Sequence, residues 1–196
     1  MSKDVTLRNL DFDEIPEVSS ILVQCWKYAY KDLINDEYLS SLNALVYAIN
    51  SDGDERLSAI HDALSIRHAR RSIFHTVYEE NLSELSEGTA VYTELHLVFS
   101  RNEIEAIIQI WPELLMEFES AFHVLTYFGY YAGALYGILL DDFDVNWRPY
   151  VEYDTDLGLM LQDALGITEM IPFYEIDLER YGYSEITKRV ELKEVD

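Results

Sequence analysis

The stretch from residue 118 to residue 140 constrains the fold more than any other part of the chain. It reads FESAFHVLTYFGYYAGALYGILL, which is almost wholly apolar, with glycines at positions 129, 133 and 137. A spacing of four brings these glycines onto one helix face, where a second helix can approach closely in a membrane or in a soluble core. Because Glu119 and His123 interrupt the stretch, no positive flank borders it and Asp141 follows at once, we expect a buried helix of a soluble protein.

Apolar residues recur at intervals of three and four along most of the remaining chain, which predicts amphipathic helices. The predicted helices run from Asp13 to Ala29, Asp36 to Ile49, Leu57 to Arg71, Glu79 to Phe99, Asn102 onward with an interruption or restart at Pro112, and Asp156 to Leu165 before Gly166. Short strands are possible at Val5–Leu7 and Thr187–Val195, although a helix from Ser184 fits the second segment equally well. We therefore expect one mainly α domain over residues 1–196, a helical bundle with at most one or two short terminal strands.

Composition excludes several classes of protein. The chain has 37 acidic against 14 basic residues among 196, a formal net charge of -23, so bulk charge opposes binding to nucleic acid or anionic membranes. Its 49% hydrophobic and 13% aromatic content is too high for an intrinsically disordered chain. A single cysteine, Cys25, permits no internal disulfide, and the first residues contain no apolar leader, so we expect a cytoplasmic location.

The charges are unevenly distributed. From Ser72 to Glu179 the only basic residues are Arg101 and Arg148, against twenty-one acidic ones. One interpretation is a solvated acidic surface that keeps a tyrosine-rich protein soluble. The other is an acidic face that docks a partner with a basic surface, with imitation of nucleic acid as a variant.

Three arginines close together, Arg67, Arg70 and Arg71, form a basic group within the third predicted helix. In a chain so rich in carboxylates we expect them to form ion pairs with acidic side chains. A site for an anion is the alternative.

Catalytic motifs are incomplete or missing. The sequence has no glycine-rich phosphate loop and no Gly-x-Ser-x-Gly elbow, and Cys25 lies on the apolar face of a predicted helix, as a buried structural thiol does. Of the histidines, His61, His68 and His75 are seven apart, which is about 10 Å along a helix and too far for one ion. We therefore predict no cofactor and no metal site from these residues.

Three segments together resemble the helical part of a Glu-zincin-type metallopeptidase family, over about residues 36 to 190. Leu64-Ser-Ile-Arg-His-Ala-Arg-Arg71 is similar to an arginine-rich helix that precedes the third metal ligand. Glu87-Gly-Thr-Ala-Val-Tyr-Thr-Glu94 resembles the family pattern Glu-Gly-x-Ala-x-Tyr-x-Glu. Tyr130 to Asp141, with Trp147 downstream, is similar to the long buried helix that follows.

The resemblance implies a role for Glu87 as a zinc ligand, with Tyr92 and Glu94 supporting the site or its walls. The family also needs His-Glu-x-x-His, in which two histidines bind zinc and the glutamate activates water, and this sequence has no such string. The resemblance therefore implies a scaffold without its chemistry. A possible remaining pocket would involve Glu87, Tyr92, Glu94, Tyr127 and Tyr131; the tyrosines among them also fit a simple core role.

The N-terminal part resembles the opening strand and two helices of GNAT-type N-acetyltransferases. This likeness rests on Val5-Thr-Leu-Arg-Asn-Leu-Asp-Phe-Asp-Glu-Ile15, Trp26-Lys-Tyr-Ala-Tyr-Lys-Asp-Leu-Ile34 and Asp36-Glu-Tyr-Leu-Ser-Ser-Leu42, and faintly on Phe173–Glu175 and Tyr181–Tyr183. Members of that family bind acetyl-CoA with a Gln/Arg-x-x-Gly-x-Gly/Ala loop. Residues 43–170 contain no such loop.

The sequence thus predicts first a non-catalytic acidic protein that acts in interaction or regulation on a degenerate metallopeptidase-like helical scaffold. Its expected partner is a protein with a basic surface, and self-association is possible. The alternatives are a zinc-dependent metallopeptidase-like hydrolase, a GNAT-type acetyltransferase and an inhibitor that imitates nucleic acid. The first of these would use zinc, and the second acetyl-CoA.

Overall fold

The computed structural model of the chain describes residues 34–74, 77–117 and 121–184, and every regular element in these ranges is a helix. The α-helices are α2 (Ile34–Ile49), α3 (Gly53–Phe74), α4 (Val77–Ser83), α5 (Thr89–Val98), α6 (Arg101–Ile108), α7 (Trp111–Met116), α8 (Ala121–Asp142) and α9 (Leu157–Ala164). A π-helix, η2 (Glu84–Gly88), joins α4 to α5, and three short 3-10 turns are η3 (Arg148–Tyr150), η4 (Phe173–Glu175) and η5 (Leu178–Tyr181). The prediction of a mainly α bundle is confirmed. The predicted terminal strands, the first predicted helix and Cys25 lie outside the described residues.

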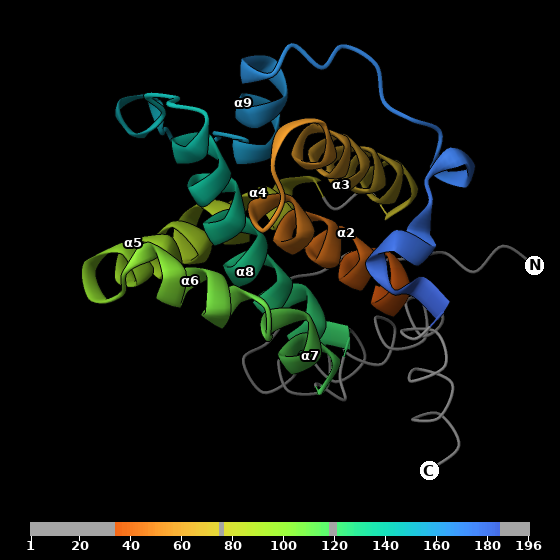
Figure 1. Cartoon of the computed structure of the whole chain (residues 1–196), viewed down its shortest axis with the longest axis horizontal. Coiled ribbons are helices and arrows are strands. Elements are labelled where there is room, and N and C mark those ends of the chain that lie inside the picture. Colours follow the sequence, from red (N-terminus) through yellow and green to blue (C-terminus); the bar gives the residue numbers. More distant parts are fainter. Residues whose placement is uncertain (1–33, 75–76, 118–120, 185–196) are drawn as a thin grey trace, which may run out of the picture.

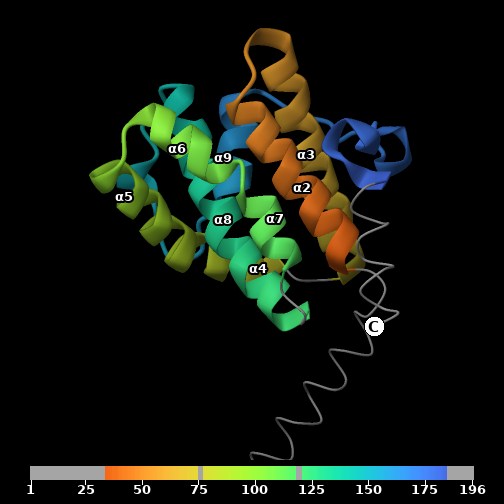
Figure 2. The ribbon, with the colours of Figure 1, turned by 60° about the horizontal axis from the view of Figure 1, so that its bottom comes forward.

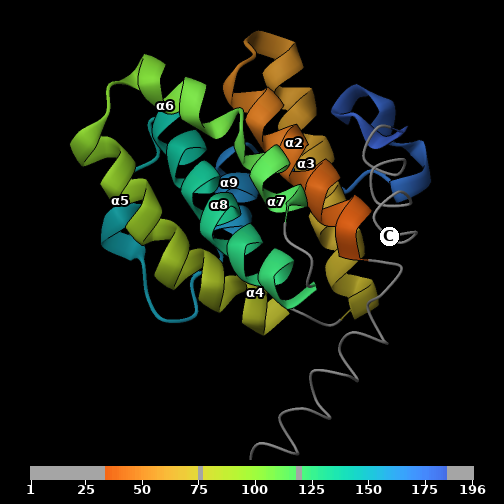
Figure 3. The ribbon, with the colours of Figure 1, turned by 90° about the horizontal axis from the view of Figure 1, so that it is seen from below.

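Helix α8 is the centre of the bundle (Figure 1). Residues 132–140 are all buried, as predicted for this apolar stretch. The α2–α3 pair packs on one side of α8, while η2 and α5 pack on the other (Figures 2 and 3). Within the ranges that the structure describes, no helix is long and apolar enough to cross a membrane. The stretch that looked most like a membrane span is therefore covered by the rest of the protein's own helices.

The close contact between α8 and η2 is made by glycines. A Cβ atom on Gly133 would lie 2.1 Å from the carbonyl oxygen of Glu84, and one on Gly88 would lie 2.6 Å from the Cα of Gly133. Both separations are far below van der Waals contact, so only glycine lets the two backbones meet here. The helix predicted over residues 79–99 is confirmed as a helical segment from Val77 to Val98, but it contains a π turn that the sequence did not predict. The chain widens into a π turn where it crosses α8 and resumes as α5.

The helix ends follow local capping rules. The predicted cap Asn102 is wrong, because Ser100 and Glu103 form a reciprocal capping box at the start of α6. The carboxylate of Asp156 accepts a hydrogen bond from the backbone N–H of Leu159 and begins α9 as predicted. Gly166, with φ +66°, follows α9 in the left-handed conformation that glycine adopts most easily. Pro112 lies in the first turn of α7, where its missing N–H costs nothing.

A short turn at residues 50–52 connects α2 to α3, and Arg56 fastens it. Its guanidinium donates to the carbonyl oxygens of Ser51, Ala48 and Ile49 at 2.6, 3.1 and 3.2 Å. The carbonyls of Ala48 and Ile49 are among the last of α2, which the helix itself leaves without donors. Arg56 also forms an ion pair with Asp142 at the end of α8, 3.4 Å away. One side chain thus joins three helix ends.

We expect Gly133→Ala to destabilise the protein severely, by about 3 kcal/mol or more, because the new methyl group would overlap the backbone of Glu84. Urea denaturation followed by circular dichroism would measure the change. Glu94→Ala, at an exposed position of α5, is the control and should change the unfolding free energy by less than about 0.5 kcal/mol. Similar stability of both variants would contradict the close approach.

Candidate functional site

The candidate site begins with three buried arginines on one face of α3. Arg67, Arg70 and Arg71 are spaced by three and four residues, so their side chains leave the helix in similar directions. The facing segment supplies Glu80 from α4 and Glu84 from η2, again four apart, and all five of these side chains are buried. The sequence prediction that these arginines pair with carboxylates is confirmed.

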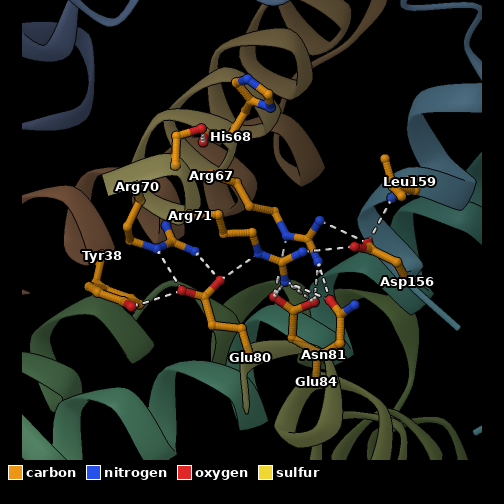
Figure 4. A network of polar contacts seen from close by, with 11 residues as sticks. Tyr38, Arg67, His68, Arg70, Arg71, Glu80, Asn81, Glu84, Asp156 and Leu159 are labelled. Carbon is orange, nitrogen blue, oxygen red and sulfur yellow. Dashed lines mark hydrogen bonds and ion pairs between the residues drawn. The ribbon is translucent and has the colours of Figure 1, made fainter. Parts of the chain in front are cut away.

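One half of this network is centred on Glu80 (Figure 4). Arg70 binds both of its oxygens, through Nε at 3.1 Å and Nη2 at 2.9 Å, and Arg71 Nε donates to Oε2 at 2.8 Å. Tyr38 of α2 donates its hydroxyl to Oε1 at 2.8 Å. The Arg70 guanidinium also lies on the rings of Tyr38 and Phe128, 4.1 and 4.6 Å from their centroids. The ion pair of Arg70 with Glu80 therefore connects α2, α3, α4 and α8.

The other half connects to a distant part of the chain. Glu84 accepts from Arg67 Nη2 at 2.6 Å, and Asn81 accepts from both Arg67 and Arg71 at 3.2 and 2.7 Å. Asp156, at the start of α9, forms ion pairs with Arg67 Nη1 at 2.8 Å and with Arg71 Nη1 at 2.7 Å. Three guanidinium groups thus face three carboxylates, so the network is neutral as a whole.

Electrostatics explains how these charges remain in a buried place. Burial by itself opposes ionisation, but Arg70 and Arg71 outweigh it and hold the pKa of Glu80 far below its ordinary value. Burial likewise opposes ionisation of Asp156, but the positive charges of Arg67 and Arg71 outweigh it and lower the pKa of Asp156. Both carboxylates therefore stay charged at neutral pH and keep their hydrogen bonds.

Asp141 and Asp142 at the end of α8 organise a second polar cluster. Asp141 accepts from the Trp147 indole N–H at 2.9 Å, from Arg148 at 2.6 Å and from the hydroxyl of Tyr92. Asp142 forms a two-bond pair with Arg101, both distances being 2.8 Å. Negatively charged residues are unfavourable at the C-terminus of a helix, which is the negative end of the helix dipole. The cationic and N–H donors around Asp141 and Asp142 offset that effect.

The two clusters hold both ends of an exposed loop. Arg148, bound to Asp141, fixes its beginning, and Asp156, bound to Arg67 and Arg71, fixes its end. Inside the loop, the backbone N–H of Glu152 donates to the hydroxyl of Thr155 at 2.7 Å. The loop at residues 149–155 is thus anchored at both ends and exposes Tyr150, Glu152, Tyr153 and Asp154 to solvent, an arrangement in which loops of proteins often carry function.

The residues that the sequence proposed for a pocket fall into two places. Tyr92 is buried at the Asp141 cluster, where its ring lies 5.3 Å from that of Trp147. Tyr127 and Tyr131 lie together on α8, 6.5 Å between ring centroids. Tyr131 also stacks on Trp111 at 4.6 Å. Tyr131 thus contributes to packing with Trp111, and Tyr92 belongs to a different part of the bundle.

The two glutamates of that proposal, Glu87 and Glu94, are both exposed. Glu87 lies on η2 and accepts a hydrogen bond from the hydroxyl of Tyr130, which raises the pKa of that tyrosine. Among the described residues, no group of three or more histidine, cysteine, aspartate or glutamate side chains is placed to hold a metal ion. His61 instead bonds the carbonyl of Glu169 at 2.8 Å.

Sequence reasoning missed the roles of Glu80, Glu84 and Asp156. A signal for the first two existed, because Glu80 and Glu84 repeat the four-residue spacing of Arg67 and Arg71. Asp156 lies 85 residues from Arg71, and no local pattern connects them.

Comparisons of the chain with models of protein families, with curated proteins and with solved structures found no match.

We expect Glu80→Gln to lower the unfolding free energy by about 3–5 kcal/mol, because it leaves Arg70 and Arg71 buried without their shared counter-charge. Chemical denaturation would measure the loss. Glu113→Gln, at an exposed position of α7, should stay within about 0.5 kcal/mol of the parent protein. A loss below about 1 kcal/mol for Glu80→Gln would mean that the network contributes little.

Acidification should weaken the fold through the same carboxylates. Because the pKa values of Glu80 and Asp156 are lowered in the folded state, the unfolded chain takes up protons first as the pH falls. This stabilisation is complete above about pH 5 and is lost progressively below about pH 4.5. Urea denaturation between pH 7 and pH 3 would show it. Asp156→Asn should lose less stability than the parent over this range, and equal losses would argue against the assignment.

Proposed function

We propose that the protein is a non-catalytic acidic interaction module whose partner is a protein with a basic surface. The observation that carries this proposal is that the described arginines are engaged with groups of the same chain, while most of the described carboxylates face solvent. The described ranges contain seven arginines, no lysine and twenty-six aspartates and glutamates. Solubility alone does not require a surface of one sign, because interspersed charges of both signs also keep a protein soluble.

The arginines are occupied internally. Arg67, Arg70 and Arg71 are buried in the network; Arg56 and Arg101 bind Asp142. Arg148 binds Asp141. Arg180 bonds the hydroxyl of Ser58 at 3.0 Å and lies over the ring of Tyr47.

Most of the carboxylates, by contrast, face solvent. Asp52, Asp54 and Glu55 line an open depression beside Tyr47, and Glu152 and Asp154 lie on the exposed loop. A field of one sign accelerates encounter with an oppositely charged partner and disfavours anionic ones such as nucleic acid or acidic membranes. A basic protein surface is therefore the class of partner that this charge distribution supports.

Affinity capture would test the proposal. The full-length protein, immobilised through one terminus, should retain proteins of basic isoelectric point from a lysate at 0.1 M NaCl and release them at 0.5 M, because salt screens such contacts. A variant with Glu79, Glu113, Glu152 and Glu169 changed to glutamine should retain them less at every salt concentration. Partners that are acidic, or retention that does not depend on salt, would overturn the proposal.

A further inference from the structure

The described residues include three strongly exposed tyrosines on two connected segments, the loop at residues 149–155 and α4. Tyr150 and Tyr153 are on the loop held at both ends, and Tyr78 lies in the first turn of α4; they are 68%, 71% and 60% exposed. The hydroxyls of Tyr78 and Tyr153 are hydrogen-bonded to each other at 2.5 Å, which joins the loop to α4. We call Tyr78, Tyr150 and Tyr153 the tyrosine patch.

Large exposed aromatic rings are unfavourable in water on a surface that binds no partner. Tyrosine combines a large apolar ring with few rotatable bonds, so it is enriched where proteins bind other proteins. Because ion pairs anchor both ends of the loop, ordering it on binding costs less entropy. The patch therefore has the composition of a docking surface and lies on an anchored loop.

Charge identifies the partner of this surface. Glu79 follows Tyr78 directly, and Glu152 and Asp154 flank Tyr153; all three carboxylates are exposed. None of these three carboxylates makes an ion pair with a residue that the structure describes. A second copy of this chain would bring the same negative charges together, so charge opposes self-association at this surface.

Aromatic rings with carboxylates around them are suited to guanidinium groups. Arginine stacks its flat face on a ring and donates bidentate hydrogen bonds to carboxylates, which the compact ammonium of lysine does less well. The protein uses this chemistry in its own interior and surface, with Arg70 on Tyr38 at 4.1 Å and Arg180 on Tyr47 at 4.6 Å. No arginine among the described residues lies over a ring of the tyrosine patch.

We propose that the tyrosine patch docks an arginine-rich segment of the protein's partner, with guanidinium groups stacked on Tyr150 and Tyr153 and paired with Glu79, Glu152 and Asp154. This inference rests on the proposed function and names the surface and the chemistry through which it acts. It adds an aromatic contribution to the attraction between opposite charges. Affinity should therefore depend on which cation the partner presents, and not on positive charge alone.

A fluorescently labelled nona-arginine peptide and a matched nona-lysine peptide test the proposal on the full-length protein at 50 mM NaCl, with binding followed by anisotropy. The parent protein should bind the arginine peptide at least threefold more tightly. The double substitution Tyr150→Ser with Tyr153→Ser should weaken arginine binding by about tenfold, from the loss of two cation–π contacts, and should remove the preference over lysine.

Tyr174→Ser is the matched control, because Tyr174 is 84% exposed but lies in η4. It should bind both peptides like the parent protein. Melting curves would verify that each variant is folded, and Tyr150→Phe with Tyr153→Phe should retain binding, since the stacking surface remains.

The outcomes separate the two proposals. If the parent protein binds both peptides equally and the serine variants change nothing, the tyrosine patch is not the docking surface, while acidic docking of a basic partner stands. If the parent binds neither peptide, the proposed function fails together with this inference. An equal loss of binding in the Tyr174 variant would also overturn the assignment of the patch.

Discussion

The buried pairing of three arginines with three carboxylates is the interaction on which the rest of the structure depends. Glu80 joins Arg70 and Arg71 across the α3–α4 packing, and Asp156 brings in the start of α9 from far along the chain. Such a network gains little net energy over apolar packing, because each charge loses its hydration. Its geometric demands are nevertheless strict: removing any one member leaves an uncompensated charge inside the protein. The network thereby favours one arrangement of these helices over others with a similar apolar core.

The same network has a consequence at the surface. Since the described arginines are engaged with internal or neighbouring groups, the outward charge is left almost entirely negative. The ion pairs of Asp156 and of Arg148 also fix the two ends of the loop that carries Tyr150 and Tyr153. Interior electrostatics and surface recognition are therefore linked in this protein: the groups that hold the helices together also position the exposed tyrosines. A change in the buried network is expected to reach the loop through Asp156.

Local sequence patterns were sufficient where local physics decides the structure. Apolar periodicity predicted α2, α3 and α9 within a few residues, and Pro112 and Gly166 were correctly placed at helix boundaries. The helix predicted over residues 79–99 was confirmed, but its π turn at η2 was not predicted, because the close approach of Gly88 to Gly133 of α8 involves residues that are distant in sequence. The cap of α6 was wrong by two residues, because the capping box at Ser100 depends on Glu103 rather than on Asn102.

The sequence by itself determined that this chain forms buried helices, that its arginines near position 70 form ion pairs with carboxylates, and that its surface is acidic. Composition and periodicity act over neighbouring residues, so they can be read without coordinates. Only the tertiary structure decided which carboxylates those arginines receive and which tyrosines remain exposed. Glu80, Asp156 and Tyr153 acquire their roles from residues that are distant in sequence, and such pairings follow from how the helices pack around α8.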